Sequence, residues 1–234
     1  MNDFGAAFTR AFELIAAFDA DLLQIVLLSL RVSTQAVLVA AAIGLPLGAL
    51  LAVYRFPGRT PVLVLLNAFM GLPPVVVGLV IYLLLSRAGP LGELGLLFTP
   101  RAMIIAQAVL VTPIVAALGR QAVADAYAAY HEQLASFGLR RPVMIPTLLW
   151  ESRHAVVVAV LAGFGRAIAE VGAVFIVGGN IDGVTRVMTT AIALETARGQ
   201  LDLALGLGVI LVSLAVMVNA AAMGLRALSA RALG

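Results

Sequence analysis

The chain has 234 residues, of which 62% are hydrophobic and 12% are charged, and its mean hydropathy is +1.09. A soluble domain carries about 25% charged residues, so this composition excludes a soluble protein and predicts an all-α integral membrane protein. The formal charge of +3 is spread along the chain without a basic block, which argues against a nucleic-acid partner.

Two residue types are missing from the sequence. All 15 basic residues are arginine, and there is no cysteine. A Walker A phosphate loop needs a lysine on the nucleotide phosphates, so this chain cannot carry that ATPase site. His131 and His154 have no second ligand at helical spacing. We therefore expect no catalytic residue, no metal site and no cofactor in this chain.

The first 21 residues place Phe4, Phe8, Phe12 and Ile15 at helical spacing, with acidic residues between them. This pattern is typical of an amphipathic helix that lies in the membrane interface. A flexible acidic tail is the alternative interpretation of residues 1–21.

Five apolar segments follow, each near the roughly 20 residues that span a bilayer. The first extends from 22 to 54, with its membrane part at 32–54 after Arg31; the others are 61–85, 102–118, 155–177 and 203–225, and a tail occupies 229–234. The interval between the fourth and fifth segments, 178–202, is predicted to be a polar loop. The second segment is interrupted by Gly71, Pro73 and Pro74. Because proline donates no backbone hydrogen bond, we expect a kinked or broken helix there, which either lines a pathway or only packs against a neighbour.

The longest polar interval, Asp125–His154, lies between the third and fourth apolar segments, and we bound the loop that it overlaps at 120–153. Placing it in the cytoplasm puts eight arginines inside and five outside, with three acidic residues inside and eight outside. The positive-inside rule then predicts an external N-terminus and an internal C-terminus.

Two charged residues, Arg166 and Glu170, lie in the middle of the fourth apolar segment, four residues apart on one predicted helical face that also carries Gly163. Charges at this depth are costly and are usually paired or turned toward protein. The pair either stabilises helix packing, or Arg166 provides the positive electrostatic field of an anion pathway. Our candidate residues for the pathway or a subunit interface are Gly71, Pro73, Pro74, Gly163, Arg166 and Glu170.

Three segments resemble a known family. Glu132–Gly138 resembles the EAA loop of bacterial ABC-transporter permeases, with the same spacing from glutamate to glycine but Gln133 and Leu134 in place of two alanines. Residues 71–78 and 165–181 look like segments of oxyanion permeases, and the short N-terminus, five spans and Gly-Gly-Asn at 178–180 most resemble the permease subunit of tungstate importers.

The resemblance, which covers roughly residues 22–228, implies a type I ABC importer permease fold in the cytoplasmic membrane. It implies a homodimer, two ATPase subunits that use the ATP, and an external substrate-binding protein. The expected ATPase-coupling residues are Glu132, Gly138, Leu139, Arg140, Arg141 and Pro142, where Gly138 either permits close contact or only ends a helix. A molybdate or sulfate permease, an intramembrane enzyme and a scaffold without a pore are the alternatives.

Overall fold

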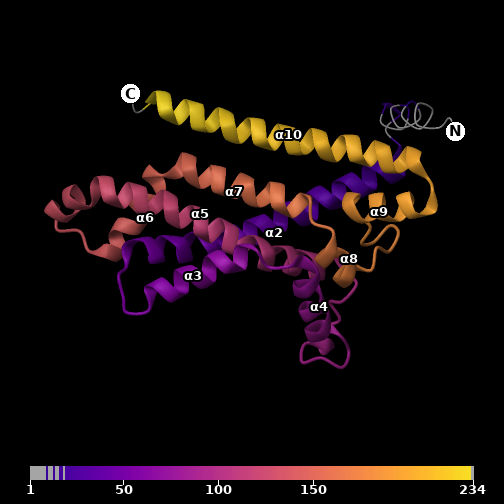
Figure 1. Cartoon of the computed structure of the whole chain (residues 1–234), viewed down its shortest axis with the longest axis horizontal. Coiled ribbons are helices and arrows are strands. Elements are labelled where there is room, and N and C mark those ends of the chain that lie inside the picture. Colours follow the sequence, from indigo (N-terminus) through magenta and orange to yellow (C-terminus); the bar gives the residue numbers. More distant parts are fainter. Residues whose placement is uncertain (1–8, 10–12, 14–15, 18, 233–234) are drawn as a thin grey trace. The chain divides into compact units, whose positions relative to one another are not determined.

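The computed structural model describes residues 9, 13, 16, 17 and 19–232, with side chains through residue 225, and it is helical without strands over this part of the chain (Figure 1). The interfacial helix expected at 1–21 lies mostly outside the described residues. The elements are α2 (Ala20–Val53), α3 (Arg59–Met70), α4 (Pro74–Leu85), a 3₁₀ turn η1 (Gly92–Leu94), α5 (Pro100–Ser136), α6 (Arg141–Glu151), α7 (Arg153–Ile168), α8 (Gly172–Gly178), α9 (Met188–Arg198) and α10 (Leu201–Ala232).

Within the described residues, α2, α5 and α10 are each long and apolar enough to cross a membrane. The count rises to five if the pairs α3 with α4 and α6 with α7 are each taken as one broken span. The second pair is bent by 74° at Ser152. The structure thus confirms an all-helical chain with several apolar helices.

The expected break in the second apolar segment is confirmed. Helix α3 ends at Met70, and the Gly71 amide donates to the Ala68 carbonyl oxygen at 3.1 Å. Helix α4 then begins at Pro74, which is tolerated at the first helical position because its missing N–H would have had no partner there.

The fourth apolar segment, 155–177, contains a break that the sequence did not indicate. Helix α7 ends at Ile168 and α8 begins at Gly172. No proline marks this break in the sequence. Glu170 instead accepts a hydrogen bond from the Ala173 amide at 3.2 Å, so a side chain takes the place of a helical carbonyl at the start of α8. The break depends on a contact that helical periodicity cannot reveal.

The chain divides into two compact units. Each unit contains one part of α2, α5, α7 and α10, because the boundaries between the units fall inside these helices. Among the described residues, one unit comprises those up to 36, 73–107 and 166–217, and the other comprises 37–72, 108–165 and those from 218 onward. In this second unit, α6 packs Met144 and Leu148 against Ala49, Val53 and Val123.

The same unit holds two helix contacts that depend on glycine. A Cβ on Gly48 of α2 would lie 2.4 Å from the Ala116 carbonyl oxygen of α5, so only glycine lets these backbones approach so closely. Gly163 of α7 faces the same helix, and its Cβ would meet Val111 and Val115 side chains at 2.9 Å. Gly163 therefore supports packing within the chain.

Candidate functional site: the broken helices around Glu170

The first unit contains a buried carboxylate at the gap between α7 and α8. The Glu170 side chain is only 3% exposed, and one of its oxygens forms an ion pair with Arg166, which stands on the last turn of α7. Its other oxygen accepts the Ala173 amide of α8. The predicted pairing of Arg166 with Glu170 is confirmed. The two residues do not lie on one continuous helix, however, because Arg166 is in the last turn of α7 and Glu170 is in the gap before α8.

Breaking a helix inside an apolar environment leaves backbone groups that need partners. Here other helices supply them: Gln107 of α5 donates to the Ala167 carbonyl oxygen at 2.9 Å, and Thr189 of α9 donates to the Glu170 carbonyl oxygen at 2.7 Å. The helix end at Ile168 is thus tied to two neighbouring helices of its unit. The amide oxygen of Gln107 is buried without a hydrogen bond among the described residues.

Helix α4 packs directly on α8, and this contact joins the two segments that resembled oxyanion permeases. A Cβ on Gly78 would lie 2.8 Å from the Ala173 Cα atom, and one on Gly172 would lie 2.9 Å from a Val75 methyl group. Glycine on both helices therefore allows close approach. The candidate residues Pro74 and Glu170 belong to these two contacting segments.

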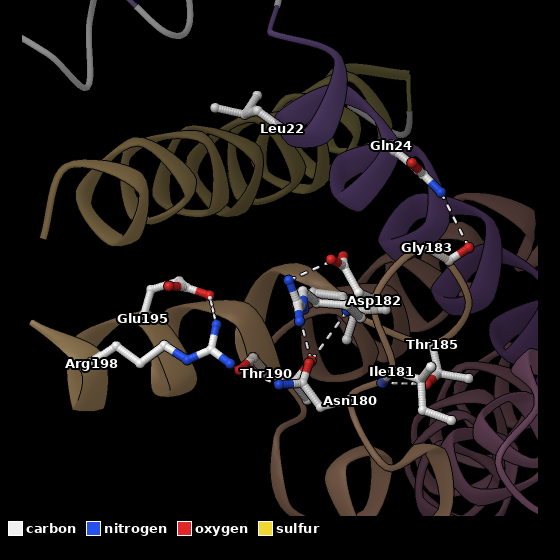
Figure 2. A network of polar contacts seen from close by, with 12 residues as sticks. Leu22, Gln24, Asn180, Ile181, Asp182, Gly183, Thr185, Thr190, Glu195 and Arg198 are labelled. Carbon is white, nitrogen blue, oxygen red and sulfur yellow. Dashed lines mark hydrogen bonds and ion pairs between the residues drawn. The ribbon is translucent and has the colours of Figure 1, made fainter. Parts of the chain in front are cut away.

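The connection from α8 to α9 is fixed by side chain to backbone hydrogen bonds (Figure 2). The Thr185 hydroxyl donates to the Gly178 carbonyl oxygen at 2.6 Å and accepts the Ile181 amide at 2.9 Å. Gln24 of α2 donates to the Gly183 carbonyl oxygen at 3.1 Å. These bonds hold the connection in one conformation beside the start of α2.

Helix α9 was not expected from the sequence, which suggested a polar loop between 178 and 202. The helix buries Glu195, whose side chain is 3% exposed and pairs with Arg198 at 3.3 Å (Figure 2). Ser29 of α2 accepts the Met188 amide at 2.8 Å and so caps the first turn of α9. The polar residues serve packing here, which is why polarity alone suggested a loop.

The polar segment Asp125–His154 comprises the end of α5, a turn, α6 and the first two residues of α7. Helix α5 continues to Ser136, Gly138 adopts φ +70°, and α6 begins at Arg141. The Gly138 amide donates to Ala135 at 2.9 Å and the Leu139 amide to Leu134 at 3.4 Å, the paired bonds of a Schellman cap. Gly138 therefore ends α5 in a left-handed conformation, with no atom within 4 Å of where a Cβ would stand.

The expected coupling residues gather around this turn. Glu132, Gly138, Arg140, Arg141 and Pro142 are exposed, while Leu139 packs against the core that holds α6.

Sequence reasoning missed the exposed apolar residues beside this turn and along α6. Phe137 is 69% exposed, Val143 is 56% exposed and Trp150 is 70% exposed. Arg153 lies over the Trp150 ring at 5.3 Å. The signal in the sequence was the single tryptophan within a polar interval. Together with Arg140 and Arg141, these residues form what we call the α6 surface.

No protein-family model matches the chain. It is 41% identical over 204 residues to a protein described as a probable anion ABC transporter permease from Haloferax volcanii, covering 85% of this chain and 88% of that one. It is 38% identical over 220 residues to the tungstate uptake system permease protein TupB of Peptoclostridium acidaminophilum, covering 94% and 96%. Identity to the molybdenum transport permease ModB of Escherichia coli is 29% over 187 residues, covering 76% and 82%.

Proposed function

The chain belongs to the permease family of ABC importers for oxyanions, and from that premise we propose that it forms the membrane pathway of a tungstate importer. The observation that carries the choice of anion is its higher identity, over nearly the whole chain, to a tungstate permease than to a molybdate permease. A molybdate or sulfate permease of the same mechanism is the second candidate.

We propose that five spans cross the cytoplasmic membrane with the N-terminus outside and the C-terminus inside, in a type I importer fold. The arginine distribution supports this orientation, because it places the α6 surface in the cytoplasm. Two copies of the chain would enclose the pathway, and an external binding protein would deliver the anion. The chain needs no cofactor of its own.

ATP hydrolysis belongs in this proposal to a separate subunit. The sequence has no lysine for a Walker A loop, so a partner must supply the nucleotide site. Two such ATPase subunits would dock on the cytoplasmic side, one on each copy.

The α6 surface supports this docking. Met144 and Leu148 anchor one face of α6 in the core, and another face leaves Val143 and Trp150 exposed. Exposed large apolar side chains beside arginine are typical of a protein interface. Motion of an ATPase subunit against this surface would reach α7 directly, because α6 and α7 are separated only by Ser152.

We propose that Arg166 and Glu170 brace the break between α7 and α8. The carboxylate is nearly enclosed and both of its oxygens already have partners within the chain. A residue that binds a passing anion would need free donors, and Glu170 has none to offer. Arg166, with 35% of its side chain exposed, is the member that could also face a pathway.

Uptake by the reconstituted complex tests the choice of anion. The permease, its ATPase and its binding protein are placed in proteoliposomes, and accumulation of labelled tungstate, molybdate and sulfate is measured at equal concentrations. We expect ATP-dependent tungstate uptake. Uptake of molybdate or sulfate with no uptake of tungstate would reject the proposed substrate.

Co-purification tests the docking surface. Trp150→Ala should reduce the amount of ATPase subunit recovered with the permease, because it removes an exposed anchor without disturbing the core. Phe69→Ala is the matched control, since Phe69 is also exposed but lies on α3. Full retention of the ATPase with Trp150→Ala, at unchanged permease yield, would remove this residue from the interface.

A further inference from the structure

A second polar feature of the first unit is a cavity of about 340 Å³ that is separate from Glu170. Its walls come from α2, from the last residue of η1 and the loop that follows it, and from the first turns of α5. Two arginines, Arg31 and Arg101, line it together with Gln35. We propose that this cavity is an anion reception site, which holds a tetrahedral oxyanion at the outer end of the pathway before it is translocated.

The charge of the cavity favours an anion. No acidic residue lines it, and neither arginine has an ion-pair partner in the part of the chain that the structure describes. The nearest acid in sequence is Glu93, which is exposed in η1 and does not line the cavity. Arginine presents several N–H donors in a planar fork that suits an oxyanion, and the Gln35 amide offers two more donors.

The cavity wall is held in place by hydrogen bonds. The Thr99 hydroxyl donates to the Leu96 carbonyl oxygen at 2.6 Å, and the Phe98 amide donates to the Val177 carbonyl oxygen at 2.9 Å. Helix α5 begins at Pro100, so the positive end of its dipole lies in the same wall. Two side-chain cations and one helix terminus therefore act on the same volume.

The size and exposure of the site suit transient binding. At about 30 Å³ per water molecule, the cavity holds on the order of ten waters, so an oxyanion would keep much of its hydration there. Arg31 and Arg101 are both exposed, and exposed charges are screened by salt beyond about 8 Å. We expect the site to raise the local anion concentration about tenfold, at the low end of electrostatic focusing.

This inference rests on the proposed function for the identity of the anion and for the outward orientation of the cavity. Both can be tested without measuring transport, because the chain has no native cysteine that would react with a thiol reagent. Leu94→Cys places a thiol at the cavity, since Leu94 lines it and is 59% exposed. Ala88→Cys is the control thiol, in the same connection between α4 and α5 but outside the cavity.

The experiment uses the permease–ATPase complex in phosphatidylcholine proteoliposomes and two membrane-impermeant methanethiosulfonates, one anionic and one cationic. We expect the ratio of anionic to cationic reaction rates to be about tenfold higher at Leu94→Cys than at Ala88→Cys. Arg31→Gln with Arg101→Gln should lower the ratio to the control value, and Arg101→Lys should largely keep it. Millimolar tungstate should slow the anionic reagent more than sodium chloride of equal ionic strength.

Several results would overturn the inference. An equal ratio at the two cysteines, or a ratio that survives loss of both arginines, would mean that the arginines do not attract anions into this cavity. Loss of the preference when anionic lipid is added would assign the arginines to lipid headgroups. Weaker affinity of the binding protein for Arg31→Gln with Arg101→Gln, with tungstate having no effect on labelling, would assign them to protein docking.

The same proteoliposomes separate this inference from the proposed function. If the complex with its binding protein does not take up tungstate but the anionic preference persists, the proposed substrate is wrong and the anion site stands. If tungstate uptake is normal and Arg31→Gln with Arg101→Gln changes neither uptake nor labelling, the site is wrong and the function stands. Arg87→Gln, which removes an exposed charge outside the cavity, controls for net charge.

Discussion

Removing the Glu170 carboxylate should destabilise the permease because Arg166 would lose its partner. Breaking a buried ion pair costs about 3–5 kcal/mol. Since 35% of the Arg166 side chain is exposed, solvent screening lowers this figure to about 2–3 kcal/mol. The Ala173 amide also loses its acceptor, which adds about 1 kcal/mol. We therefore expect Glu170→Ala to cost about 3–4 kcal/mol in unfolding free energy.

For a chain of this length, 1 kcal/mol shifts Tm by about 2–4 °C, so Glu170→Ala should lower Tm by about 6–16 °C. The assay is thermal loss of the monodisperse complex in detergent. Glu170→Gln should be milder, because its amide oxygen can still accept the Ala173 N–H. Arg166→Met combined with Glu170→Ala should cost less than Glu170→Ala alone, since no charge is left unpaired.

A double-mutant cycle decides the result. We expect a coupling of about 2 kcal/mol between Arg166 and Glu170. A coupling below about 0.5 kcal/mol, or a double variant as unstable as Glu170→Ala, would refute the bracing argument. A double variant that assembles normally but does not transport would instead favour a place for Arg166 in the pathway.

Three further predictions follow from the structure and the sequence. Gly138→Ala should lower stability by about 1–2 kcal/mol, because it forces a side chain into the left-handed region at φ +70°, whereas Gly138→Asn should be milder. Thermal unfolding of both variants measures this effect, and equal Tm values for Gly138→Ala and the parent would contradict it. Gly78→Ala should disrupt the α4–α8 contact. Gly165→Ala should be neutral or stabilising, because no neighbouring atom lies within 4 Å of the new Cβ. A smaller loss of folded yield for Gly78→Ala than for Gly165→Ala would be inconsistent with this geometry. The purified permease without its ATPase should hydrolyse no ATP, and turnover that co-purifies with the chain through several columns would overturn the proposed division of labour.

The sequence was sufficient for the class of the protein and for the break that proline encodes. Apolar composition predicts membrane helices. Pro73 and Pro74 have no backbone N–H to donate, so they cannot continue the preceding helix. The Arg166–Glu170 pair could also be predicted, because two charges four residues apart in an apolar segment have few alternatives to each other. Each of these predictions depends on local chemistry.

The remaining features depend on contacts between distant parts of the chain. The gap after Ile168 needs Gln107 and Thr189 to satisfy the freed carbonyl oxygens, and both come from other helices. Helix α9 looked like a polar loop in the sequence. Its polar residue Glu195 is buried by tertiary packing, which the sequence pattern does not reveal. Predicting the α6 surface requires knowing that Met144 faces the core. A helix of only 11 residues has too few turns for its sequence pattern to show which face is buried.

The exposure of α10 has a consequence for how this family changes over time. Only 17% of its membrane-length apolar segment is buried within the chain, against 50% for α2 and 67% for α5. A side chain that meets lipid has to be apolar but need not have a particular shape, so exchanges among leucine, isoleucine, valine and methionine should accumulate faster along α10 than along α5. Positions on α10 that resist such exchanges would mark where lipid gives way to another protein chain.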